Sequence, residues 1–89
     1  MLLLPSRLTH DVAAPAMLAL ADTLAGEAGG QVVADAGRLQ EFDSSALAVL
    51  LACRRRALAA GKGFAVQGLP ERLRQLAGLY GVEALLPAA

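Results

Sequence analysis

The amino-acid sequence predicts an α/β domain with a small, mostly parallel or mixed β-sheet of about four strands and about three helices. Short β-rich segments alternate with longer segments of helical apolar spacing, an order typical of a parallel sheet covered by helices. The chain is also 56% hydrophobic but only 3% aromatic, so its core must consist mainly of Leu, Val and Ala. A length of 89 residues predicts a single domain over residues 1–89.

The first third of the chain predicts a strand region followed by a helix. Leu2 to Leu8 has the pattern of one or two short strands, and Pro5 indicates a sheet edge or a bend because proline cannot donate to a sheet. A helix is expected from about Asp11 to Ala25, before the helix-breaking sequence GEAGG. One face of this helix gathers apolar residues at helical spacing: Met17, Leu20, Ala21 and Leu24.

A second strand and a second helix are predicted in the middle of the chain. Gln31 to Asp35 (QVVAD) is β-rich and is followed by a loop, Ala36 to Phe42 (AGRLQEF). We expect the helix to run from about Ser44 to Ala60 and to stop at Gly61, because glycine readily ends helices. The first half of this helix is apolar almost all round, which predicts deep packing.

The last third of the chain predicts one more strand and a third helix. Phe64 to Gly68 (FAVQG) is the strand, and Pro70 opens the helix at a position that suits proline. Gly81 is expected to be a left-handed C-cap, with Val82 placed for the hydrophobic contact that often follows one. The predicted buried face of the helix has spacing i, i+3, i+4 and i+7: Leu73, Leu76, Ala77 and Tyr80.

Charge, apolar runs and cysteine content exclude several classes of protein. Eight basic and eight acidic residues give zero formal net charge, which argues against a nucleic-acid partner. The longest apolar run, Ala46 to Cys53, is far below the roughly 18 residues of a membrane span, so we expect no direct membrane insertion. The N-terminal MLLLPSRL lacks the basic region of a signal peptide. The single cysteine fits the cytosol, and its apolar surroundings predict a buried, inert thiol.

The sequence contains no recognisable catalytic, metal or cofactor motif, so we expect no enzymatic activity, metal or cofactor. The single histidine, His10, is far in sequence from the serines, and we expect it to be solvated or to cap a helix. Ala59 to Gly63 (AAGKG) lacks the first glycine and the Ser or Thr of a phosphate-binding loop. Arg54 to Arg56 fan over about 200° of a helix, which favours a solvated face from which Arg55 or Arg56 could still reach a partner.

Three small polar residues, Asp43, Ser44 and Ser45, precede the apolar run of the second helix. Asp or Ser at such a position caps the helix by accepting a backbone N–H, and this local interpretation needs no further function. The predicted topology adds a second interpretation. The helix begins just beyond the carboxyl end of the strand Gln31 to Asp35, which is the edge where open α/β sheets usually place binding sites.

The segment VVADAGRLQEFDSSALAVLL resembles the STAS domain, a family named for sulfate transporters and anti-sigma factor antagonists. The shared pattern is a strand that ends in Asp, a short loop, and Asp-Ser/Thr-small-Gly-Leu at the start of a helix. The downstream GKGFAVQGLPERLRQLAGLYGVEALLP is also similar to the family, so the resemblance covers nearly the whole chain and implies the STAS fold. Ala46 stands where the family usually has glycine.

The resemblance implies two alternative functions. One is an accessory subunit of the bacterial Mla ABC transporter, which moves phospholipids between membranes; its partner is the ATPase subunit and, through it, a membrane permease. The short chain, its end soon after the third helix and the LAGLYGVEALLP ending favour this use. The alternative is an anti-sigma factor antagonist, which is switched when a serine kinase phosphorylates the residue matching Ser44.

Family resemblance also implies the roles of individual residues. The partner-binding residues would be Asp43, Ser44, Ser45, Ala46 and Leu47, with Ser44 as the possible phosphorylation site. We expect Asp43 and Ser45 to hold the loop and cap the helix, while Ser44 presents its hydroxyl outward. The protein would be cytoplasmic and peripheral to the inner membrane through its complex.

Overall fold

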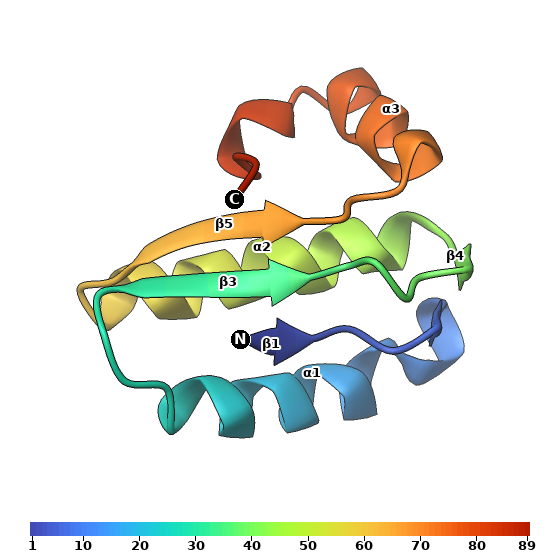
Figure 1. The fold of residues 1–89 in the computed structure, drawn as a ribbon. Coiled ribbons are helices and arrows are strands. Elements are labelled where there is room, and N and C mark those ends of the chain that lie inside the picture. Colours follow the sequence, from blue (N-terminus) through green and yellow to red (C-terminus); the bar gives the residue numbers. More distant parts are fainter.

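A three-stranded parallel sheet forms the centre of the computed structural model, which describes residues 1–89 (Figure 1). Its strands are β1 (Leu2–Leu3), β3 (Gln31–Asp35) and β5 (Gly63–Gln67), and β3 lies between the other two. Residues whose side chains enter the core are in register across the sheet, as in the pairs Leu2 with Ala34 and Val32 with Phe64. The prediction of an α/β fold with parallel strands is therefore confirmed.

A separate pair of short strands lies beyond this sheet. β2 (Arg7–Leu8) pairs in parallel with β4 (Glu41–Phe42), so Pro5 separates two strands that belong to different sheets. The expectation that residues 36–42 form only a loop is therefore wrong for Glu41 and Phe42. Their strand depends on pairing with β2, a contact between distant segments that local sequence does not reveal. The strands number five in two sheets, against the four expected in one.

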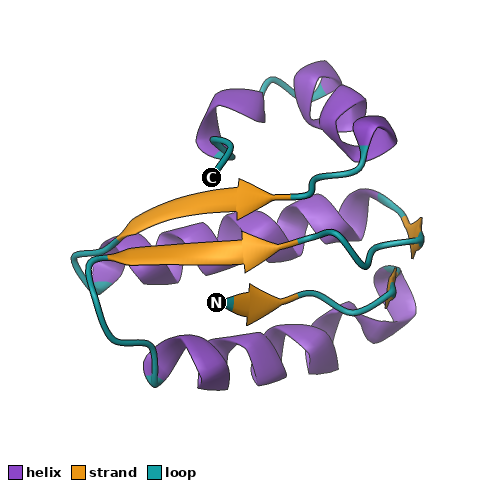
Figure 2. Cartoon of the chain, in the orientation of Figure 1, coloured by secondary structure: helices purple, strands orange, loops and turns teal.

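The chain has three helices, as predicted: α1 (His10–Ala25), α2 (Ser44–Ala59) and α3 (Glu71–Leu79). The first two connect strands, and α3 follows the last strand, β5. Figure 2 shows α2 lying behind β3 and β5, while no helix crosses the face of the sheet turned toward the viewer. A 3₁₀ turn, η1 (Glu83–Leu85), follows α3. The chain then returns to β5, where Ala88 forms an isolated parallel bridge with Val66.

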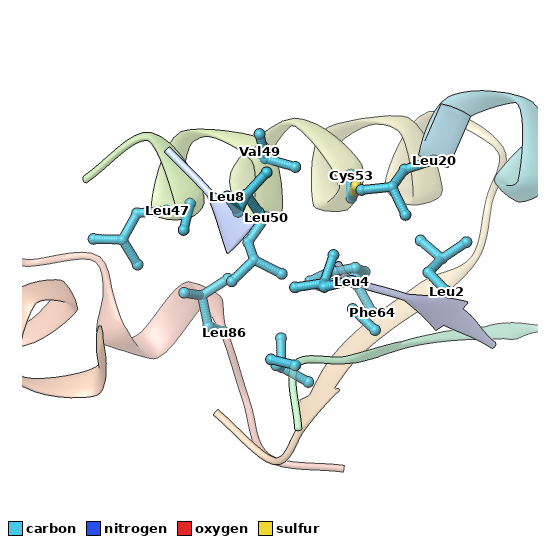
Figure 3. Packing of buried hydrophobic residues seen from close by; sticks show 14 of the residues in the cluster. Leu2, Leu4, Leu8, Leu20, Leu47, Val49, Leu50, Cys53, Phe64 and Leu86 are labelled. Carbon is cyan, nitrogen blue, oxygen red and sulfur yellow. The ribbon is translucent and has the colours of Figure 1, made fainter. Parts of the chain in front are cut away.

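The apolar core lies between the sheet and its helices. Figure 3 shows Leu47, Leu50 and Cys53 directed from α2 toward the space that Leu4 and Phe64 fill from the other side. Full burial of such a leucine contributes about 1.5–3 kcal/mol. The thiol of Cys53 is fully buried, as predicted, and desolvation raises its pKa to about 11.

The end of α3 confirms one expectation and corrects another. Gly81 has a left-handed backbone (φ 72°), and the N–H of Val82 donates to the carbonyl of Ala77 at 2.9 Å, which closes a Schellman turn. Val82 packs against the core as predicted. Tyr80, expected on the buried face, is instead 59% exposed. The helix ends at Leu79, and the turn at Gly81 carries Val82 rather than Tyr80 back to the core.

Candidate functional site

The register of β2 and β4 brings the starts of two helices together. Leu8 is paired with Phe42, and the next residue in each chain segment is a helix N-cap: Thr9 for α1 and Asp43 for α2. Thr9 makes no side-chain capping bond. The candidate site is therefore built where two parallel strands end and two helices begin.

Asp43 caps both helices. Its Oδ1 accepts the backbone N–H of Ser45 at 2.8 Å, which is the expected capping bond of α2. Its Oδ2 accepts the backbone N–H of His10, the first residue of α1, at 3.1 Å. Both N–H groups belong to the unpaired donors of a helix start, so one carboxylate satisfies a donor in each helix. The predicted capping role of Asp43 is confirmed, and its second role is new.

These bonds stabilise the charged form of Asp43. The backbone N–H of Ser45, and next that of His10, holds the pKa of the carboxyl below its usual 3.8. Two helix N-termini also face the same carboxylate, and each carries partial positive charge. Asp43 is therefore ionised at neutral pH and serves as a fixed structural anion.

A second group of charged and polar side chains holds the start of α1. Asp11, in the first turn of α1, accepts hydrogen bonds from the Thr9 hydroxyl and the Arg7 guanidinium. These two bonds, with the Thr9 bond as the larger cause, lower the pKa of Asp11. Arg7 also lies 3.4 Å from a carboxylate oxygen of Glu41, which joins β2 to β4 across the strand pair.

Ser44 is exposed and directly follows the shared cap Asp43. It is the first residue of α2, and its side chain makes no hydrogen bond within the chain. Ser45, in contrast, is half-buried and donates its backbone N–H to Asp43. The outward hydroxyl expected for Ser44 agrees with this exposure.

Ala46 and Leu47 do not belong to the surface of the site. Ala46 is 0% exposed and Leu47 is 3% exposed, and both are part of the core cluster. Helix geometry explains the burial of Ala46, which lies about 200° around α2 from Ser44. Leu47 lies only about 60° from Ser44, so its burial shows that the core reaches close to the exposed start of the helix. The methyl group of Ala46, at the position where glycine was expected, points into the core and does not obstruct the exposed surface.

Asp35, the acidic residue at the end of β3, shapes the loop that leads to the site. Its Oδ1 accepts the backbone N–H of Gly37 at 2.9 Å and so turns the chain directly after the strand. Gly68 packs against this turn, since a Cβ added there would lie 2.9 Å from the Cα of Gly37. The two Asp residues of the motif therefore have separate tasks, one in the loop and one at the helix starts.

Sequence reasoning missed three residues that flank the site. His10 contributes its backbone N–H, while the guanidinium of Arg72 in α3 lies 5.0 Å from the ring centroid of Phe42. One feature could have indicated His10: the strands that end at Leu8 and Phe42 are each followed directly by the start of a helix. No local pattern links Phe42 with Arg72, because α3 follows one strand and one helix later.

The structure also places the other residues that the sequence suggested for catalysis or metal binding. The side chain of His10 is exposed and makes no hydrogen bond within the chain. Residues 59–63 form the end of α2 and the turn into β5. No group of three or more His, Cys, Asp or Glu residues could hold a metal ion, and no helix has the length and apolar character to cross a bilayer.

Comparison with known proteins adds one match. A family model described as "Mlab, STAS domain" matches residues 1–87. No curated protein matches the chain. The matched range contains all the strands and helices described above, including both helix starts joined by Asp43.

Proposed function

The chain belongs to the STAS domain family, in its MlaB-type branch, and from this premise we propose that it is a non-catalytic accessory subunit of an ABC-type phospholipid transporter. It binds the ATPase subunit of that transporter and stabilises or activates it. Through the ATPase it is linked to the membrane permease, so it works in the cytoplasm, peripheral to the inner membrane. In this role the domain is a rigid docking module and catalyses no reaction itself.

The observation that carries this proposal is that Ser44 is exposed, makes no side-chain hydrogen bond and lies at a helix start that is held in place. A side chain at the first position of a helix moves little when the helix start is held, and Asp43 holds this one through Ser45 and His10. Pre-organised surfaces lose less conformational entropy on binding. The hydroxyl group can donate and accept a hydrogen bond, so it suits the centre of a partner contact.

Binding at this surface would stabilise the ATPase by mass action. A subunit that binds only the folded ATPase, at a free concentration 100 times its Kd, contributes about 2.7 kcal/mol to the stability of that ATPase. This support requires no movement within the small domain. A rigid α2 suits this role, and buried residues along the helix anchor it in the apolar core.

The alternative, an anti-sigma factor antagonist switched by phosphorylation, would use the same residue. Ser44 is exposed, and a phosphate there would lie at a helix N-terminus, where negative charge is favourable. The two functions differ in the partner rather than in the surface. A serine kinase or anti-sigma factor would bind in place of an ATPase.

Affinity purification of the tagged full chain from its native cells tests the proposal. We expect a P-loop ATPase and a membrane permease to be recovered with it, and the same cells without this chain to contain less active ATPase. A matched purification with Ser44→Asp should lose these partners. Recovery of a serine kinase with no ABC component would establish the alternative.

A further inference from the structure

Two adjacent hollows lie between α1 and α2, and the first begins beside the candidate site; together we call them the α1–α2 trough. The first has a volume of about 290 Å³ and starts between His10 and Ser45. The second, of about 350 Å³, continues along α2 to Arg55, Arg56 and Ala59. Met17 and Ala52 line both hollows, so the two are adjacent. From Ser45 to Ala59 the trough follows α2 for about 20 Å, at 1.5 Å per residue.

The walls of the trough are apolar and shallow. Ala13 and Ala14 of α1 face Ala48 and Ala52 of α2 across it, with Met17 at its middle. Small side chains allow the backbone of a third segment to come close to both helices. Methionine adapts its shape to different apolar partners, which suits a docking surface.

The outer surface of α1 extends this apolar area. Leu18 is 73% exposed, and its neighbours Ala14 and Ala25 on α1 are exposed as well. The only charged residues of α1 are Asp11, near its start, and Asp22 in its second half. A helix that is apolar on nearly all sides is normally covered by other structure.

The end of the trough that is farthest from the candidate site carries two arginines that form no ion pair within the chain. Arg55 and Arg56 are exposed, and no ion pair within the chain includes either of them. Arg7 and Arg74 form ion pairs within the chain, whereas the exposed Arg38 and Arg72 do not; neither of these two lines the trough. A partner that supplies carboxylates at this end would complement the two guanidinium groups.

We propose that the α1–α2 trough binds an amphipathic helix of the partner protein, with apolar residues against Ala14, Met17 and Ala52 and carboxylates at Arg55 and Arg56. A helix of about four turns matches the trough length. It would satisfy its own backbone hydrogen bonds, which an extended segment could not do here because the trough has no strand edge. The identity of the protein that carries this helix rests on the proposed function. The trough adds a second contact next to Ser44.

Site-specific photo-crosslinking in native cells tests the location of this contact. A benzophenone amino acid replaces Ala14, which lines the trough, or Ala19, an exposed alanine of α1 that lines a different hollow. We expect position 14, but not position 19, to crosslink to a helix of the ATPase that has an apolar face and an acidic end. Crosslinks from position 19 alone, to a second copy of this chain, or to a basic or extended segment would overturn the inference.

Charge variants test the chemistry of the far end. Arg55→Glu should weaken ATPase binding roughly tenfold or more. Arg54→Glu is the matched control: it makes the same charge change on the same helix, but Arg54 does not line the trough. Equal effects of the two variants would contradict the inference, as would equal binding by Arg55→Glu and wild type.

The outcomes separate this inference from the proposed function. If the ATPase is recovered but position 14 gives no crosslink to it, the trough is not a docking site and the proposed function stands. If position 14 crosslinks to an acidic amphipathic helix of a protein that is not an ATPase, the trough is confirmed and the proposed function is wrong. If neither position crosslinks to any protein, the trough inference is wrong.

Discussion

Asp43 holds the first residue of α1: its Oδ2 accepts the backbone N–H of His10 at 3.1 Å, while its Oδ1 caps α2. The two helices are thereby fixed to one carboxylate. The exposed Ser44 follows directly, and the α1–α2 trough starts at the same place. Asp43 therefore contributes to the geometry of both the Ser44 surface and the start of the trough.

Replacement of Asp43 tests this dependence. Asp43→Ala removes both acceptors and should lower the melting temperature more than Ser44→Ala, because the Ser44 side chain bonds to nothing in the chain. Asp43→Asn should fall between the two, since its amide oxygen accepts one N–H but its NH₂ group cannot accept the other. Thermal denaturation followed by circular dichroism measures the order. An Asp43→Ala domain that melts with wild type would contradict the shared-cap interpretation.

Stability should fall on acidification because of the same carboxylate. The folded-state pKa of Asp43 lies below its usual 3.8, so its charged form is favoured by folding. This contribution is fully present above the unfolded pKa and is lost as the pH falls through the lower folded pKa. Urea unfolding at several pH values below 5 should show a smaller loss for Asp43→Asn than for wild type. Asp11 adds a loss in the same direction, which the Asp43→Asn variant retains. Identical pH dependence of the two proteins would count against this account.

The thiol of Cys53 should be inert while the domain is folded. Burial raises its pKa to about 11, so about one thiol in a thousand is ionised at pH 8, and it is also inaccessible. We expect Ellman's reagent to react with Cys53 only as fast as the domain unfolds, and rapidly in denaturant. A Cys53→Ala, Ala60→Cys variant is the control, because Ala60 is exposed at the end of α2. Fast labelling of native wild type would show that the core opens.

The purified domain should not hydrolyse ATP by itself. No carboxylate or serine forms a hydrogen bond with the side chain of the single histidine, and residues 59–63 do not form a phosphate-binding loop. A phosphate-release assay on the isolated chain measures this, with His10→Ala and Ser44→Ala as matched variants. Turnover that survives further purification and disappears in either variant would overturn the prediction.

Local chemistry in the sequence was sufficient to predict most elements. The apolar run after Ser45 and the glycine at position 61 predict α2, which ends at Ala59, and β-rich composition predicts the strand Gln31–Asp35. The capping role of Asp43 could be predicted because its carboxylate accepts the backbone N–H of Ser45, only two residues later in the chain. All of these features depend on residues that are close in sequence.

The features that were not predicted depend on contacts between distant segments. The strand Glu41–Phe42 exists through its pairing with β2, and the bond from His10 to Asp43 follows from that pairing. The residues predicted to bind the partner were five consecutive ones, and two of them, Ala46 and Leu47, lie in the core. A pattern matched along the chain does not separate the exposed face of a helix from its buried face.

The affinity of Ser44→Asp for the ATPase subunit tests the central claim most directly. A carboxylate at the first position of α2 should stabilise the isolated domain by about 0.3–1 kcal/mol, because it lies at a helix N-terminus. At a packed interface an unpaired charge costs several kcal/mol, so we predict binding about a hundredfold weaker or more, with the melting temperature unchanged or slightly higher. Calorimetric titration of both proteins, from preparations whose melting is measured in parallel, gives this ratio. Equal affinity of Ser44→Asp and wild type would show that Ser44 only begins the helix and lies outside the docking surface.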